Sequence, residues 1–275
     1  MQRFPAGPRE MVASFWRNRA LILALTKREI DGRYRGSVMG IAWSLFTPVL
    51  LLVIYTFIFS VVFQTRWGVD TGTGGGKTEF ALILFVGLIV HGLFAECIIR
   101  APNLITGNVN YIKKVVFPLE ILPWVAFCAA LFHTCISLAV LVAARLVLHQ
   151  HLPWTAVLFP VVMLPLVLGS LGVSWFLSAL GAYIRDIGQV VTMISTILLF
   201  MSPVFYPISA LPERFHVVVH INPLAFIIEE SRNTLIFGKV PDFTHWAILT
   251  LVSAVIAWLG FVWFQKTRKG FADVI

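Results

Sequence analysis

Residues 28–63 read REIDGRYRGSVMGIAWSLFTPVLLLVIYTFIFSVVF, a basic segment that runs directly into a long apolar one. Arg28, Arg33 and Arg35 lie in the polar part, whereas residues 39–63 contain no ionisable side chain except the phenol of Tyr55. About 25 residues in a helix rise about 37 Å, which exceeds the roughly 30 Å hydrocarbon core of a bilayer. The stretch therefore predicts a membrane-spanning helix that follows a positively charged interface segment.

The composition of the whole chain agrees with a protein that crosses the membrane several times. Of the 275 residues, 59% are hydrophobic and only 12% are charged, whereas soluble domains average about 25% charged residues. The net charge of +8 comes from basic residues that flank apolar segments. Because membrane topology places them there, the charge predicts no nucleic-acid partner.

Hydropathy predicts an all-α protein with six membrane spans, near residues 39–63, 80–99, 121–148, 157–183, 189–207 and 244–264. The fifth span is the weakest, since Pro203 and Pro207 interrupt its far end. We divide the chain into a cytoplasmic tail with an interface helix (1–38), one membrane domain (39–264) and a cytoplasmic tail (265–275). With both termini inside, 15 of the 21 Lys and Arg residues face the cytoplasm, as the positive-inside rule favours. The six outside are Arg66, Lys77, Arg145, Arg214, Arg232 and Lys239.

Two segments outside the predicted spans have an amphipathic or partly apolar sequence. Residues 11–28 are too charged to cross a bilayer and predict an amphipathic helix lying in the interface, with a plain cytoplasmic helix as the alternative. Residues 203–241 hold two short apolar pieces, 215–221 and 224–237. We expect these pieces to form two short re-entrant helices on the outer side, with a folded external loop as the alternative.

Small residues recur every fourth position along the fourth predicted span, at Ser170, Ser174, Ser178 and Ala182. Because small side chains allow helix backbones to approach closely in a membrane, this stripe predicts a packing seam.

The segment GTGGGKT (72–78) resembles a phosphate-binding loop but lacks the first glycine, since Thr71 occupies that position. It also joins two membrane spans on the outer side, away from ATP. We therefore predict a flexible turn, and we expect energy for active transport to come from another subunit or an ion gradient.

Enzyme chemistry has little support in the sequence. Glu96 and Arg100 have the spacing of a helical ion pair, and His91 and His133 lie inside spans without an acidic relay. We find no nucleophile–base pair and no cluster with metal-ligand spacing, so we predict neither a catalytic nor a metal site.

Five segments resemble a known family. The stretch RYRGSVMGIAWSLFTPVL (33–50) resembles the opening signature of ABC-2-type permeases that export cell-surface polysaccharides, such as O-antigen, capsule and teichoic acid. The matching positions are Arg33, Tyr34, Arg35, Ser37, Gly40, Trp43 and Pro48. Four similar segments follow in the family's order: VVFPLEILP (115–123), YIRDIGQV (183–190), SPVFYP (202–207) and INPLAFIIEESRNTLIFG (221–238). The likeness covers residues 20–265.

The resemblance implies a homodimer in the bacterial inner membrane that pairs with two copies of a separate cytoplasmic ATPase. ATP and Mg would bind to that ATPase, and this chain would hold no cofactor. The substrate implied is a polysaccharide on a polyprenyl diphosphate lipid, and membrane lipids would surround the chain. Export of this substrate would serve the biosynthesis of a surface polysaccharide such as lipopolysaccharide.

The resemblance also implies roles for particular residues. A short coupling helix within 101–117 would dock on the ATPase, with Asn103, Asn108, Tyr111, Lys113 and Lys114 as its candidate contacts. The outer segment would act as a periplasmic gate, with Asn222, Pro223, Glu229 and Arg232 as candidates. Arg28, Arg33 and Arg35 would lie where the diphosphate arrives, and guanidinium groups suit phosphate oxygens. Contact with anionic lipids is the alternative for these arginines.

Two other functions remain open at this point. A drug or small-lipid exporter of the same class would often carry a larger domain between the first two spans, for which residues 64–79 leave no room. A membrane-embedded glycosyl- or acyltransferase would require clustered acids or histidines, for which Glu229, Glu230, His216 and His220 are the loose candidates.

Overall fold

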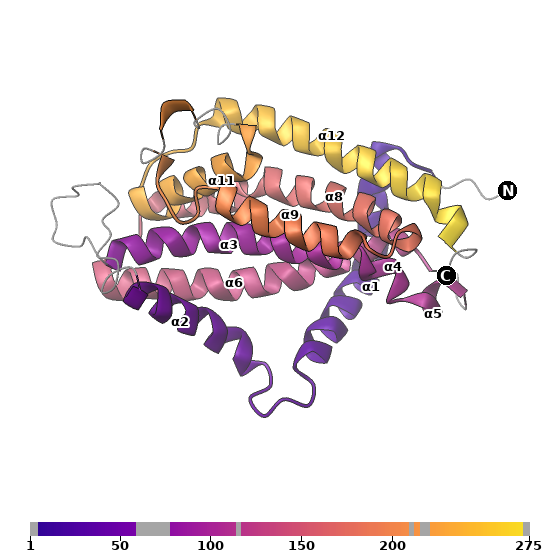
Figure 1. Cartoon of the computed structure of the whole chain (residues 1–275), viewed down its shortest axis with the longest axis horizontal. Coiled ribbons are helices and arrows are strands. Elements are labelled where there is room, and N and C mark those ends of the chain that lie inside the picture. Colours follow the sequence, from indigo (N-terminus) through magenta and orange to yellow (C-terminus); the bar gives the residue numbers. More distant parts are fainter. Residues whose placement is uncertain (1–4, 59–77, 114–116, 209–211, 215–220, 272–275) are drawn as a thin grey trace.

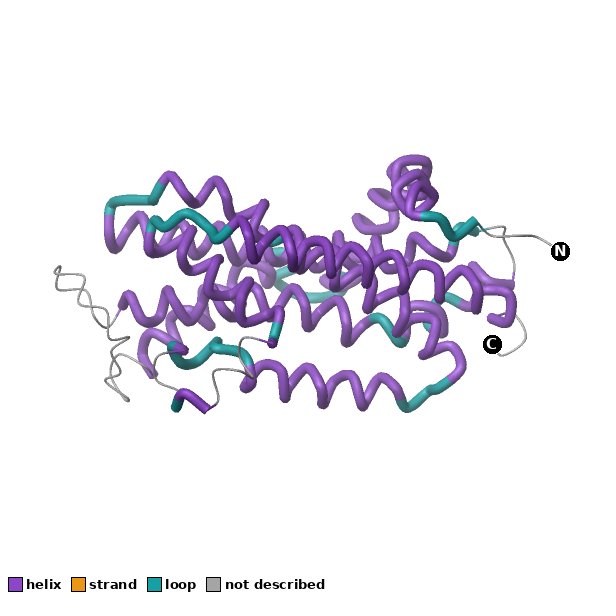
Figure 2. The backbone as a smooth tube through the Cα atoms, turned by 90° about the horizontal axis from the view of Figure 1, so that it is seen from above, coloured by secondary structure: helices purple, strands orange, loops and turns teal. Residues whose placement is uncertain are grey.

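The computed structural model describes residues 5–58, 78–113, 117–208, 212–214 and 221–271. Helices and turns make up this part of the chain, and it contains no strand (Figure 2). The all-α prediction is therefore confirmed for the described residues. The longer helices are α1 (Pro8–Tyr34), α2 (Ala42–Phe57), α3 (Thr78–Arg100), α6 (Leu122–His149), α8 (Leu164–Tyr183), α9 (Ile187–Met201), α11 (Pro223–Arg232) and α12 (Phe243–Thr267). Short helical turns connect them: α4 (Asn103–Thr106), α5 (Val109–Lys113), η2 (Leu119–Ile121), η3 (Trp154–Leu158), α7 (Phe159–Val162), η5 (Asn233–Phe237) and η6 (Arg268–Gly270).

Four helical segments are long and apolar enough to cross a membrane, namely Glu79–Arg100, Leu119–Leu148, Trp154–Tyr183 and Phe243–Gly270. They correspond to the second, third, fourth and sixth predicted spans. The first and fifth correspond to α2 and α9, which are shorter apolar helices. Helix α9 ends at Met201 instead of reaching residue 207, because Pro203 follows and Ser202 is already extended.

The long helices α3, α6, α8, α9 and α12 run side by side along one axis, and α1 runs across one end of this bundle (Figure 1). Helices α1 and α2 meet in a V, whose tip contains Gly36 and Gly40 with positive φ angles of 82° and 54°. Glycine adopts these angles without steric cost, which allows the sharp reversal. The interface helix that we predicted for residues 11–28 requires a helix in this crosswise orientation.

The predicted packing seam on α8 is confirmed. Ser170, Ser174 and Ser178 are buried, and an added Cβ on Gly172 would meet the backbone of Ala257 on α12 at 2.6 Å. On the same helix, a Cβ on Gly181 would meet the carbonyl oxygen of Pro102 at 2.2 Å. The small residues of α8 therefore let it approach both α12 and the connection after α3.

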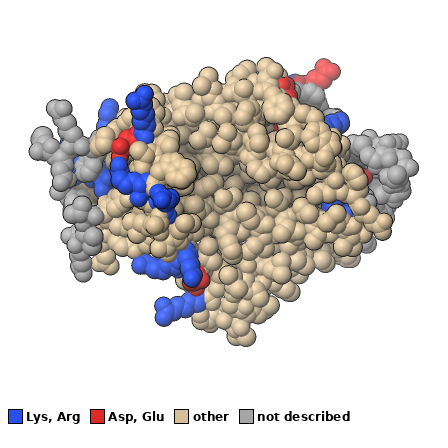
Figure 3. All heavy atoms as spheres, turned by 180° about the vertical axis from the view of Figure 1, so that it is seen from behind, with Lys and Arg blue, Asp and Glu red and all other residues tan. Residues whose placement is uncertain are grey.

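Lys and Arg side chains gather at one end of the molecule, and an uncharged belt covers the middle of the same face (Figure 3). The basic end is the one at which the two termini lie (Figure 1). This distribution agrees with the predicted placement of both termini on one side of the membrane.

Several predicted positions lie outside the described residues. They include the glycine-rich segment at 72–77, Lys114 and most of the short apolar piece at 215–221. Residues 103–113 form the two short turns α4 and α5 where we expected one coupling helix. Gly107, which caps the end of α4, and Asn108 separate them.

Candidate functional site

The three arginines of the opening segment lie at the end of α1 and line three hollows. We name these the α4 hollow (about 480 Å³), the α1 hollow (about 780 Å³) and the α2 crevice (about 430 Å³). Arg28 lines the first two, Arg35 lines the α1 hollow and Arg33 lines the α2 crevice. The arginines therefore do not form one cluster.

A chain of ion pairs separates the α4 hollow from the α2 crevice. Arg33 Nη1 lies 2.5 Å from Glu96 Oε1, and Arg100 Nη1 lies 3.4 Å from the same oxygen. Arg100 also pairs with Glu29 on α1. The predicted pair of Glu96 and Arg100 is thus confirmed, and two residues of α1 extend it into a link between α1 and α3.

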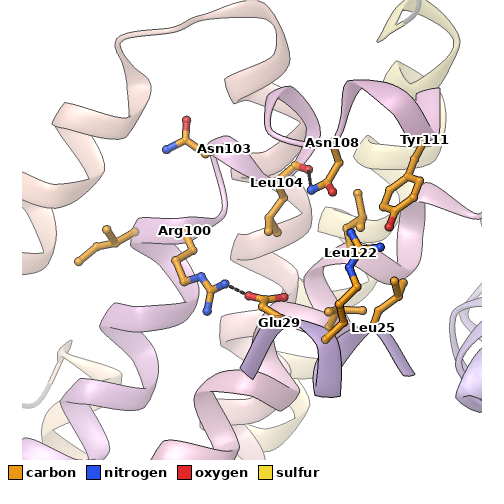
Figure 4. A pocket seen from close by; sticks show the side chains of 11 residues that line it. Leu25, Glu29, Arg100, Asn103, Leu104, Asn108, Tyr111 and Leu122 are labelled. Carbon is orange, nitrogen blue, oxygen red and sulfur yellow. Dashed lines mark hydrogen bonds and ion pairs between the residues drawn. The ribbon is translucent and has the colours of Figure 1, made fainter. Parts of the chain in front are cut away.

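The α4 hollow brings together three of the five candidate coupling residues: Asn103, Asn108 and Tyr111 (Figure 4). The guanidinium of Arg28 lies over the Tyr111 ring, 5.9 Å from its centroid, in a cation–π contact. Lys113 is the last residue of α5. The hollow thus joins residues of α1 to the connection between α3 and α6.

The α1 hollow is the most basic of the three. Lys27, Arg28 and Arg35 line it together with a single carboxylate, Asp31. Tyr34 lines both this hollow and the α2 crevice, and burial raises the pKa of its phenol. An excess of positive charge in an open hollow at the basic end of the molecule suits an anionic group.

Glu120 is an organising residue that our sequence analysis did not select. Its side chain is buried, accepts a hydrogen bond from Ser14 Oγ at 3.2 Å and pairs with Arg268 Nη1 at 2.5 Å. Its carbonyl oxygen accepts a hydrogen bond from the indole of Trp175 at 2.9 Å. Glu120 thus ties α1, α8 and the end of α12 together. The sequence signal that could have identified Glu120 is its position as a lone carboxylate at the edge of an apolar segment.

At the opposite end, Arg232 fixes α11 against the bundle. Its side chain is fully buried, and Nε donates to the Ile83 carbonyl oxygen at 3.1 Å while Nη2 donates to that of Val204 at 2.9 Å. Nη1 pairs with Glu229 at 2.7 Å. A rigid guanidinium satisfies three acceptors from three segments, which a lysine cannot do.

Asn222 and Pro223 begin α11. The Asn222 side chain accepts a hydrogen bond from the Leu224 amide at 3.0 Å and donates to Ser202 Oγ at 2.9 Å, so it caps α11 and holds it to the end of α9. Pro223 occupies the first turn, where it needs no hydrogen-bond partner. Burial raises the pKa of Glu230, which accepts a hydrogen bond from the Asp242 amide. The four candidate gate residues thus belong to one connected structure.

The sequence of this part of the chain matches a known family. A sequence model described as ABC-2 type transporter matches residues 20–236, which run from α1 into the η5 turn after Arg232. The chain belongs to the ABC-2 type transporter family. The match includes the three hollows, the ion-pair chain and the Arg232 contacts.

Individual relatives of this ABC-2 chain match nearly end to end. An O-antigen export system permease protein from Myxococcus xanthus is 27% identical over 267 residues, which cover 96% of this chain and 99% of the relative. One from Klebsiella pneumoniae is 26% identical, covering 93% and 95%. A polysialic acid transport protein from Escherichia coli is 23% identical, covering 90% and 92%.

Proposed function

We propose that this chain is the permease subunit of an ATP-driven transporter that exports a cell-surface polysaccharide linked to a polyprenyl diphosphate lipid. The observation that carries the proposal is the end-to-end match with O-antigen export permeases of nearly equal length. The chain itself performs no chemistry, and a partner ATPase binds ATP and Mg.

The proposal includes six spans, with α2 and α9 crossing in addition to the four longer segments. Both termini face the cytoplasm of the inner membrane, because the basic end of the molecule then faces inward. Two copies of the chain form the transporter, and α11 re-enters the membrane from the outer side. Burial of α11 against α3, with Arg232 fully enclosed, supports the last point.

The α4 hollow is the contact site that we propose for the ATPase. Its residues come from α1 and from the connection between α3 and α6, so a group seated there would push on two elements at once. Asn103, Asn108 and Tyr111 offer hydrogen bonds and an aromatic face, and Lys113 and Lys114 would extend the contact. The ion pair between Arg100 and Glu29 would carry the movement into α3.

The α1 hollow is the site that we propose for the diphosphate. Lys27, Arg28 and Arg35 supply the positive charge, whereas the charge of Arg33 is compensated by Glu96 at 2.5 Å. Of the three arginines that we predicted from the sequence, the proposed diphosphate site therefore keeps Arg28 and Arg35, and it adds Lys27. At the outer end, Asn222, Pro223, Glu229 and Arg232 would hold the gate segment in place.

The proposed function is tested by deleting the gene and by purifying the complex. Cells without the chain are expected to accumulate the lipid-linked polymer inside and to display none on the surface. The chain is expected to co-purify with an ATPase whose activity rises with this polymer. Replacing Asn108 and Tyr111 together with Ala is expected to lower that stimulation severalfold while the chain still inserts into the membrane.

Normal surface polymer in the deleted cells would contradict the function. Full stimulation in the double variant would contradict the docking site alone. Val109→Ala is the matched control, since Val109 lies in the same turn but does not line the α4 hollow.

A further inference from the structure

Apart from Tyr34, the residues that line the α2 crevice belong neither to the proposed ATPase contact nor to the proposed diphosphate site. It lies between the end of α1, α2, α3 and α6, and its volume of about 430 Å³ falls within the usual 300–1,000 Å³ range of small-molecule sites. Along α3 it extends from Glu96 to Phe85. Eleven residues of helix correspond to about 16 Å, so the crevice reaches deep into the membrane layer.

The polar groups in the crevice are costly at that depth unless something satisfies them. His133 Nε2 is buried without a hydrogen-bond partner, while its Nδ1 lies 3.3 Å from the hydroxyl of Tyr34. The hydroxyls of Thr134 and Ser137 donate to the helix backbone at 3.0 Å, which leaves their oxygens able to accept. An unsatisfied buried imidazole nitrogen calls for a hydrogen-bonding ligand.

Aromatic rings complete the lining. Trp43, Tyr34 and Tyr55 all line the crevice, and Trp43 is 40% exposed. Flat aromatic faces stack on the apolar faces of sugar rings, and the hydroxyl, imidazole and carboxylate groups suit sugar hydroxyls. A phospholipid acyl chain would use the rings but would leave the imidazole and the hydroxyl oxygens unsatisfied.

We propose that the α2 crevice binds the sugar that carries the diphosphate, so that the first part of the glycan enters this crevice while its diphosphate lies in the α1 hollow. The two cavities adjoin, because Tyr34 lines both. His133 Nε2 and Trp43 are the residues that distinguish a glycan-bearing lipid from a bare one. This inference rests on the proposed function, since it assigns a part of the proposed substrate to a place in the structure.

The test compares two probes on the purified complex in nanodiscs. The first is the lipid-linked polymer isolated from cells that lack this chain, and the second is polyprenyl diphosphate without sugar. His133→Leu is expected to weaken binding of the first probe about tenfold, which corresponds to the loss of one buried hydrogen bond, and to leave the second unchanged. Trp43→Ala is expected to act in the same direction, and Trp43→Phe to restore binding.

Ala139→Leu is the matched control, because Ala139 is exposed on α6 and does not line the crevice. Wild-type affinity for the polymer in both His133→Leu and Trp43→Ala would overturn the inference, as would an equal loss for both probes. Failure of the wild-type complex to bind the polymer would instead contradict the proposed function. If His133→Leu does not assemble, the Trp43→Ala and Trp43→Phe variants test the inference by the same comparison of polymer binding with polyprenyl diphosphate binding.

Discussion

Arg28, Arg33 and Arg35 lie within about two helical turns of one another at the end of α1, yet the surroundings of Arg33 differ from those of the other two. Helical geometry places residues 28 and 35 on the same face of the helix and residue 33 on another. Arg33 meets Glu96 across 63 positions of sequence. A charge whose partner is fixed in this way contributes to packing, whereas Arg35 remains available to a ligand in the α1 hollow.

The diphosphate site is tested by neutralising Lys27 and Arg35 together with Gln. We expect affinity for polyprenyl diphosphate in neutral nanodiscs to fall about thirtyfold at physiological salt, since each basic residue near a charged lipid contributes about 1 kcal/mol. The measurement is a binding titration with the purified complex. Arg9→Gln with Arg19→Gln removes the same charge from exposed positions of α1 outside the hollow and is expected to leave the affinity unchanged. Equal losses in the two double variants would show that only net charge matters.

At the scale of elements, α11 illustrates how one residue can hold a helix. Its amphipathic sequence allowed a re-entrant or an external position, and hydropathy does not distinguish them. Arg232 binds carbonyl oxygens of α3 and of the turn after α9, and these atoms are 149 and 28 positions away. The position of α11 therefore depends on contacts that no local pattern records.

Replacing Arg232 with Lys tests these contacts and the proposed gate. The ammonium keeps the charge but cannot reach three acceptors, so we expect the free energy of unfolding to fall by about 1–3 kcal/mol. Thermal unfolding of the purified protein measures this loss. A looser α11 is also expected to raise the leakage of a small sugar from proteoliposomes.

Lys239→Arg serves as the control, since Lys239 is exposed just beyond the η5 turn and is expected to change stability by less than about 0.5 kcal/mol. If Arg232→Lys were as stable as the wild type and leaked no more sugar, Arg232 would not hold the proposed gate in place.

At the scale of the whole molecule, charge and hydropathy predict how the chain crosses the membrane. Single cysteines in a background without Cys97, Cys128 and Cys135 test the six-span topology. Cysteines replacing Ser37, Arg185 and Lys269 are expected to react with an impermeant maleimide only from the cytoplasmic side, and those replacing His151 and Val240 only from outside. All five positions are exposed. Reaction of positions 185 and 240 from the same side would mean that α9 does not cross.

The sequence by itself determined the helical class, the positions of the long spans, the small-residue seam of α8 and the gathering of basic charge at one end. These properties depend on local composition and periodicity, because transfer into lipid acts on each segment separately. Only the tertiary structure decided which charges pair, that Glu120 ties three helices together, and that Arg33 lines a different hollow from Arg28 and Arg35. Glu120 and Arg268 lie 148 positions apart. Such pairings arise when packed helices exclude water, and hydropathy carries no information about which helices become neighbours.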